Sequence, residues 1–152
     1  MATVEASAER RVSARIERVY EFLSDYQDKR PRILPSNFTD YEVREGGTGK
    51  GTRFHLRMTS PRERTFDMAV DEAGAQEIRE RDTASTLTTT WRMTPVGNGD
   101  ETLVRIQTQW TGASGIKGFF ERRFAPAGLR RVYQQMLERL AAEVEGAAPE
   151  RS

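Results

Sequence analysis

Cysteine is absent from the 152 residues, and histidine occurs once, as His55. Without cysteine, the chain has no disulfide framework, no thiolate zinc site and no cysteine nucleophile. A Ser/His/Asp triad would have to be built on His55, and a metal site made of several histidines is excluded. No nucleotide-binding or dinucleotide-binding glycine motif is present either. We therefore expect neither a metal ion nor a cofactor.

An excess of one charge and long apolar runs are also lacking. The 24 Lys and Arg residues nearly balance 23 Asp and Glu, and this net charge of +1 argues against nucleic acid as a partner. No stretch reaches the roughly 18 apolar residues of a membrane span, and residues 1–11 contain no signal-peptide-like apolar run. We expect a cytoplasmic protein without stable membrane insertion.

The first forty residues contain one strand pattern and one helix pattern. Residues 3–12 alternate between apolar and polar side chains, which predicts a strand with one buried face. Ser13 stands in the position of a helix N-cap, because apolar residues then recur at steps of three and four from 16 to 23. A short helical turn is predicted near residues 27–32, between that helix and the next strand.

From Asn37 onward the period changes to two residues and stays so for some seventy-five positions. Short turns rich in glycine or proline separate the alternating runs, and no helical pattern intervenes. This arrangement predicts an antiparallel meander. The expected strands cover residues 38–45, 53–58, 65–71, 77–82, 85–94 and 102–111.

The C-terminal part returns to helical spacing, with apolar residues at steps of three and four from 129 to about 145. Pro126 lacks an amide donor, so we expect a kink or a break there and a long helix after it. The length predicts one domain over residues 1–146, followed by a flexible tail at 147–152.

The order of these elements predicts the architecture. A sheet with one apolar face must cover that face, and only the C-terminal helix is long enough to do so. One helix does not fill the hollow of seven twisted strands, so an internal cavity should remain. We therefore predict an α+β fold in which a seven-stranded antiparallel sheet wraps around the long C-terminal helix. Two short helices lie between strands 1 and 2.

Two segments carry a family resemblance. Residues 12–25, VSARIERVYEFLSD, form a strand-to-helix segment, and residues 86–95, TLTTTWRMTP, followed by 99–104, GDETLV, form a hairpin. Both resemble the corresponding parts of the SRPBCC superfamily, which includes polyketide cyclase/dehydrase-like and START-related proteins. The resemblance covers residues 3–145. It implies a helix-grip fold and a cavity for apolar or aromatic small molecules, with cyclase, aromatase or hydrolase activity in some members.

The inward phase of the predicted strands supplies the candidate ligand-binding residues. They form either a plain packed core or the wall of a cavity, and their mixture of methionine, tryptophan and hydroxyls favours the cavity. The candidates are Phe54, Leu56, Met58, Phe66, Met68, Leu87, Thr89, Trp91, Ile106, Thr108 and Trp110, together with Phe120, Tyr133 and Met136 from the C-terminal part.

Three residues are candidates for proton transfer: Glu80, Tyr41 and Tyr133. In a regular strand Glu80 points into the cavity, where an unpaired carboxylate has a raised pKa. A bulge, or a place at the cavity mouth, instead leaves it in water or paired with Arg79 or Arg81, and this alternative is favoured. The tyrosines, like Tyr20, Thr89 and Thr108, either orient a ligand through their hydroxyls or are ordinary residues at the core boundary.

The opposite phase of the strands predicts a charged outer face. His55 falls on it, so we expect a surface histidine rather than a general acid or base. Arg57, Asp67, Arg79 and Arg92 share this phase and are expected to form cross-strand charge pairs.

Residues 112–120, GASGIKGFF, form a glycine-bearing segment that we interpret as a loop gating or plugging the cavity. It could instead contact a membrane or a partner, with Lys117, Arg122 and Arg123 adding positive charge. Three functions follow: a binding protein for a hydrophobic small molecule or lipid, a cyclase/dehydrase-type enzyme, and a lipid-delivery module. A homodimer is left open.

Overall fold

The computed structural model describes residues 3–60, 63–74, 76–111 and 115–146, and within the last segment it describes the side chains of 126–145. These residues form seven strands, two α-helices and one 3₁₀ helix, which follow one another in the expected order. The elements are β1 (Thr3–Val12), α1 (Ile16–Ser24), η1 (Arg30–Ile33), β2 (Phe38–Glu45), β3 (Arg53–Met58), β4 (Arg64–Gly74), β5 (Glu77–Asp82), β6 (Thr88–Val96), β7 (Glu101–Thr111) and α2 (Gly115–Gly146).

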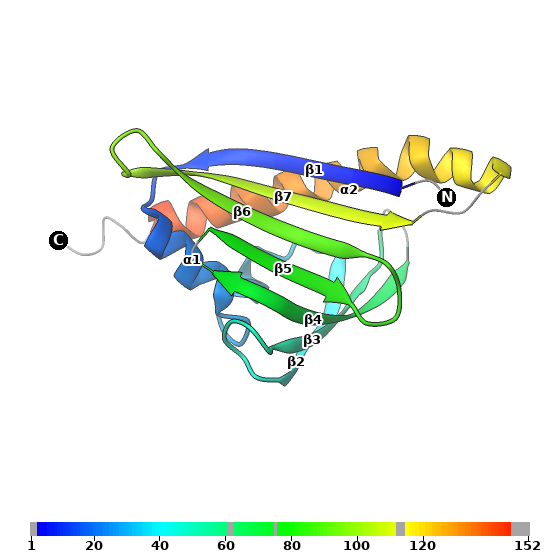
Figure 1. Cartoon of the computed structure of the whole chain (residues 1–152), viewed down its shortest axis with the longest axis horizontal. Helices are drawn as coiled ribbons and strands as arrows, with labels where there is room; N and C mark the ends of the chain where they lie inside the picture. Colours follow the sequence, from blue (N-terminus) through cyan, green and yellow to red (C-terminus); the bar gives the residue numbers. More distant parts are fainter. Residues whose placement is uncertain (1–2, 61–62, 75, 112–114, 147–152) are drawn as a thin grey trace.

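The strands form one antiparallel sheet in the order β1-β7-β6-β5-β4-β3-β2 (Figure 1). The first strand therefore pairs with the last, from Thr3 opposite Thr111 to Val12 opposite Thr102. The remaining neighbours are consecutive in the chain, as in a meander. The predicted α+β helix-grip fold with a seven-stranded sheet is confirmed.

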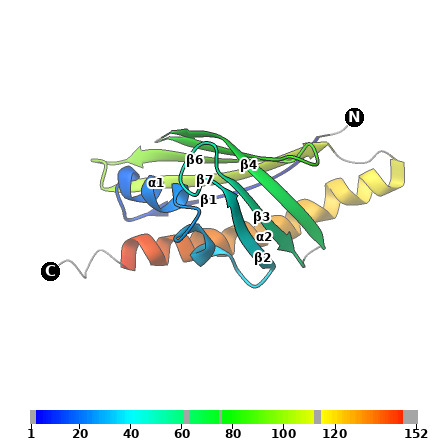
Figure 2. The same cartoon turned by 90° about the horizontal axis from the view of Figure 1, so that it is seen from below.

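The long helix α2 lies along one side of the sheet, which we call the inner face (Figure 2). It packs against β1 and η1. Alternation along each strand sends apolar side chains to this face, as Val104 and Ile106 of β7 show, and both are almost fully buried. The α2 residues Leu137 and Leu140 belong to the same buried core.

The loop between β2 and β3 holds the segment that follows α1. The Gly47 carbonyl accepts hydrogen bonds from the amides of Tyr26 (2.8 Å) and Gln27 (3.2 Å), and the Gly49 amide donates to the Ser24 carbonyl (2.9 Å). Gly46 has φ +71°, a conformation that glycine adopts without strain. These contacts fix the backbone between α1 and η1 beside the sheet.

Two sequence-based expectations about helix ends are wrong. Ser13 is not the N-cap of α1: Arg15 precedes the first helical residue and no side chain caps that end. The Ser13 amide instead donates to Glu145 Oε2 (2.6 Å), because the chain leaves β1 directly against the end of α2.

A break at Pro126 is also absent, since α2 begins at Gly115 and continues through Pro126 to Gly146. Proline costs the helix one amide donor at that position, and the packed turns that follow outweigh this loss. Residues 115–120 are therefore helix rather than loop. The side chain of Phe120 and the predicted tail at 147–152 lie outside the described residues, as do residues 112–114 of the predicted gate.

Candidate functional site

A cavity lies between the inner face of the sheet, η1 and α2. The space in it that the centre of a water molecule can reach is about 120 Å³, roughly ten times what one water needs. Its wall is predominantly apolar. The lining residues are Arg30, Leu34, Phe38, Tyr41, Phe54, Leu56, Met58, Arg64, Phe66, Met68, Glu80, Leu87, Thr89, Trp91, Ile106, Trp110, Leu129, Tyr133 and Met136.

The cavity brings together nearly all of the predicted ligand-binding residues. Thr108 is fully buried but lies behind the wall, and the side chain of Phe120 is outside the described part. All the other candidates line the space. The two-residue period of β3, β4, β6 and β7 sends the strand residues to one face, and Tyr133 and Met136 reach the cavity from α2. Whether they contact a ligand stays a prediction.

A polar group interrupts the apolar wall, and we call Tyr26, Arg30 and Glu80 the Arg30 cluster. Arg30 Nη1 donates to Glu80 Oε2 at 2.7 Å and to the Leu23 carbonyl at 3.0 Å. The Tyr26 hydroxyl donates to the same Glu80 oxygen at 2.5 Å. Arg30 and Glu80 are 5% and 3% exposed, so this is a buried ion pair supported by a buried hydroxyl.

Aromatic rings fix the guanidinium of Arg30. Its Cζ lies 4.7 Å from the centre of the Tyr26 ring and 5.0 Å from that of Trp91. Tyr26 stacks on Phe54, with ring centres 5.0 Å apart. Such cation–π contacts strengthen in an apolar site, so the charged plane is held in one orientation.

The favoured expectation for Glu80, in water or paired with Arg79 or Arg81, is wrong. Those arginines pair with Glu77 and Asp71 instead. Strand β5 is regular at Glu80, which lies opposite Val70, and the bulge falls in the neighbouring β4, between Val70 and Glu72. Because β5 keeps its phase, the carboxylate stays on the inner face with Ile78.

Burial and charge control protonation in the cluster. Burial, with a contribution from Glu80, raises the pKa of Tyr26 well above its ordinary value. Burial by itself lowers the pKa of Arg30, but the Glu80 carboxylate outweighs this and raises it. Burial also raises the pKa of Tyr41, whose hydroxyl donates to the Tyr26 carbonyl at 2.6 Å. Arg30 is therefore a permanent cation, and both tyrosines stay protonated near neutral pH.

Sequence reasoning did not find Tyr26 or Arg30. They lie in a segment with neither a helical nor a strand period, so no pattern shows which side chains point inward. The available signal was compositional: a stretch otherwise facing water contains an aromatic residue and an arginine next to Pro31. The partner of Arg30 is fifty residues away, and only the tertiary fold brings the two together.

A chain of hydroxyls forms a second polar feature of the wall. Thr89 and Thr108 Oγ1 atoms lie 2.7 Å apart, and Thr108 Oγ1 also bonds the Tyr133 hydroxyl. Burial raises the pKa of Tyr133 to about 12. The chain joins β6, β7 and α2, and each hydroxyl has a partner within it.

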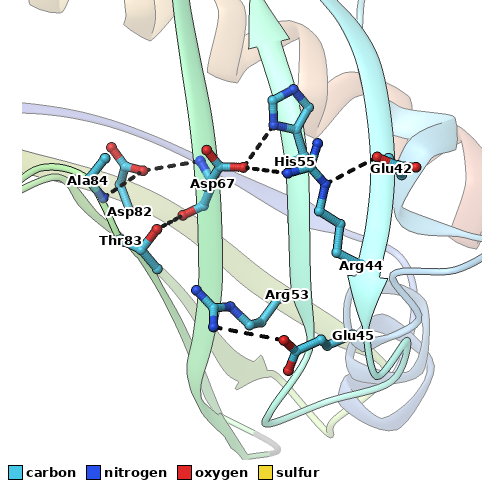
Figure 3. A network of polar contacts seen from close by, with 9 residues as sticks. All are labelled: Glu42, Arg44, Glu45, Arg53, His55, Asp67, Asp82, Thr83 and Ala84. Atoms are coloured by element: carbon cyan, nitrogen blue, oxygen red, sulfur yellow. Dashed lines mark hydrogen bonds and ion pairs between the residues drawn. The ribbon is translucent and has the colours of Figure 1, made fainter.

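The outer face of the sheet carries the charged residues, as the phase predicted (Figure 3). His55 Nδ1 lies 2.8 Å from Asp67 Oδ1, and Arg44 bridges Asp67 and Glu42. The His55 side chain is 20% exposed and does not line the cavity. The expected cross-strand pairing is confirmed for Asp67, which pairs with Arg44, and for Arg92, which pairs with Glu77 at 2.9 Å. It is wrong for Arg79, which pairs with Glu77 of its own strand, and for Arg57, whose partner Glu63 lies just before β4.

The described residues contain neither a cluster of metal ligands nor a membrane-spanning helix. No group of three or more His, Asp or Glu side chains gathers there in the manner of a metal site. Among the same residues, no helix is long and apolar enough to span a membrane.

Comparisons with known proteins agree with this geometry. The family model for polyketide cyclase/dehydrase and lipid transport matches residues 1–145. The solution structure of the KanY protein is 41% identical, with a TM-score of 0.83 over 95% of this chain and 99% of that one. No curated protein sequence matches.

Two crystal structures share the fold at low identity. The ZhuI aromatase/cyclase from Streptomyces sp. R1128 is 18% identical, with a TM-score of 0.74 over 95% of this chain and 94% of that one. Norcoclaurine synthase from Thalictrum flavum, in complex with dopamine and hydroxybenzaldehyde, is 16% identical, with a TM-score of 0.70 over 95% and 88%. The resemblance to the SRPBCC superfamily is confirmed. With its cavity between sheet and helix and a family match over nearly its whole length, this chain belongs to the polyketide cyclase/dehydrase and lipid transport family.

Proposed function

We propose that this protein binds a hydrophobic or aromatic small molecule, or a lipid, in the cavity beneath α2. The observation that carries the proposal is the wall itself, where methionine and aromatic side chains surround about 120 Å³ of space. Such a surface favours an apolar ligand by roughly 25 cal/mol for each Å² removed from water. The few polar groups in the wall would set its orientation.

Native mass spectrometry of the purified protein, compared with its denatured mass, is the first test, since a retained ligand adds mass only in the native spectrum. Titration with the neutral fluorescent probe N-phenyl-1-naphthylamine is the second. Leu56→Trp fills the cavity and should weaken probe binding about tenfold or more. Arg57→Trp, one residue along β3 on the outer face, is the matched control. Equal binding by both variants, or no binding by the wild type, would refute the proposal.

A specific feature of Glu80 supports a second function, catalysis of the cyclase/dehydrase type. Tyr26 and Arg30 both bond Oε2, and Oε1 makes no hydrogen bond to any described residue. Oε1 could therefore take a proton from a carbon next to a ligand carbonyl, while Arg30 stabilises the enolate oxygen. Tyr41 and Tyr133, whose hydroxyls already have partners, would position the substrate.

Solvent deuterium exchange into the methyl group of 2-acetonaphthone, followed by NMR, tests this chemistry without a known substrate. Glu80→Gln should slow enzyme-dependent exchange about 100-fold or more, while Tyr41→Phe and Tyr133→Phe should have smaller effects. Exchange that is no faster with protein than without it would remove the enzymatic assignment and leave the binding proposal intact.

A further inference from the structure

One edge of the Arg30 guanidinium remains open to the cavity. Both hydrogen bonds of this side chain leave from Nη1, toward Glu80 and the Leu23 carbonyl. Nε and Nη2 donate to no described residue. Among those residues, Trp91 Nε1 is the one side-chain nitrogen or oxygen that is fully shielded from solvent and has no hydrogen-bond partner. Because Nε and Nη2 of Arg30 also have no partner, they are not fully shielded. Since Arg30 lines the cavity, Nε and Nη2 are the donors of this side chain left for a ligand there.

The charge of Arg30 is already balanced. Glu80, 2.7 Å away and equally buried, supplies one negative charge for one positive charge. A ligand anion placed here would add an unpaired charge to an apolar cavity, and its lost hydration would not be repaid. At the guanidinium edge a ligand cation would find only hydrogen-bond donors and no acceptor. A neutral oxygen with free lone pairs avoids both penalties.

The guanidinium is also preorganised. The rings of Tyr26 and Trp91 hold it from 4.7 and 5.0 Å, and its backbone is tied to the end of α1, because the Arg30 amide donates to the Asp25 carbonyl at 2.9 Å. A ligand oxygen therefore does not have to order this side chain when it binds.

We propose that Arg30 is the specificity-determining residue of the cavity, and that it selects apolar ligands carrying a neutral acceptor oxygen, such as a ketone or an ester, through its free Nε and Nη2 edge. This inference rests on the proposed binding function. Glu80 has a positioning role in it, because its carboxylate sets the charge state that the ligand meets.

Three ligands of similar shape test the selection by calorimetry at neutral pH: 2-acetonaphthone, 2-ethylnaphthalene and 2-naphthoate. The wild type should bind the ketone about tenfold more tightly than the hydrocarbon, since a hydrogen bond to a charged donor is gained. It should also bind the ketone more tightly than the carboxylate. If none of the three binds, the binding function fails; if ketone and hydrocarbon bind equally, only the role of Arg30 fails.

Variants separate Arg30 from the rest of the wall. In Glu80→Gln the cation is no longer balanced, so the preference should shift from the ketone toward the carboxylate. In the double variant Arg30→Met/Glu80→Gln neither the ketone nor the carboxylate should bind more tightly than the hydrocarbon, and 2-ethylnaphthalene should still bind. The matched control is Arg81→Met/Asp71→Asn, which removes an ion pair of the outer face whose residues do not line the cavity. It should leave the ketone preference unchanged. A ketone preference that survives in the double variant would overturn the proposal.

Discussion

Breaking the buried ion pair should destabilise the protein far more than removing both of its charges. Arg30→Met leaves the Glu80 carboxylate 3% exposed, with the Tyr26 hydroxyl as its remaining hydrogen-bond donor among the described residues. Removing one partner of a buried ion pair lowers the free energy of unfolding by about 3 to 5 kcal/mol. For a chain of this length each kcal/mol lowers Tm by about 2 to 4 °C, which predicts a decrease of about 10 °C.

The double variant Arg30→Met/Glu80→Gln should recover much of this loss, because no buried charge is left without a counterion. The amide that replaces the Glu80 carboxylate keeps an oxygen that can accept from Tyr26. Urea unfolding of the wild type, both single variants and the double variant gives the coupling energy, provided the m-value stays constant. If the two single losses add within about 0.5 kcal/mol, the residues are not coupled and the reasoning is wrong.

Three further predictions concern other parts of the molecule. Burial raises the pKa of Tyr133 to about 12, so the stability that its protonated form contributes is complete below pH 10 and is lost toward pH 12. Urea unfolding should show a loss of about 3 kcal/mol from this group over that range. A titration in which the Tyr133 phenolate is fully formed near pH 10 would contradict this. Thr108→Val leaves two buried hydroxyls short of a partner and should cost about 1 to 3 kcal/mol in the same assay, whereas Thr88→Val on the outer face should cost under about 0.5. Gly46→Ala should lower Tm more than Gly97→Ala, since both have positive φ but only the former brings a Cβ within 3.0 Å of the Thr52 Cα.

The sheet could be predicted from the sequence because each strand has one buried and one solvated face. Period two therefore identified the strand and, within it, the inward residues, as for Trp91 and Ile106. Predicted and observed bounds agree for β2, β3 and β5. The β6 strand starts later than predicted, since the Ser85 hydroxyl bonds Asp82 and accepts from the Leu87 amide, which makes a turn of these residues.

The polar part of the site could not be predicted, because it depends on residues without periodicity. Arg30 has no local feature that turns it inward; its place follows from the β2–β3 loop, which holds the α1–η1 segment from across the sheet. The ion pair of Glu80 could not be predicted for a related reason. Its phase was read correctly, but a buried carboxylate is unfavourable without a counterion, and the counterion was not visible in the sequence.

The pairing of β1 with β7 has a consequence for how the chain is made. Thr3 lies opposite Thr111, and the intervening residues must be synthesised before the two strands can meet. At typical translation rates of about 5 to 20 residues per second, β1 waits roughly 5 to 20 seconds without its partner. Closure over so long a separation is also entropically slow. During this interval the edge of β1 that will pair with β7 is unpaired on the ribosome, and an unpaired strand edge is a site of aggregation. We therefore expect the time at which β7 emerges to govern how much of this protein aggregates during synthesis, more than the stability of the finished sheet does.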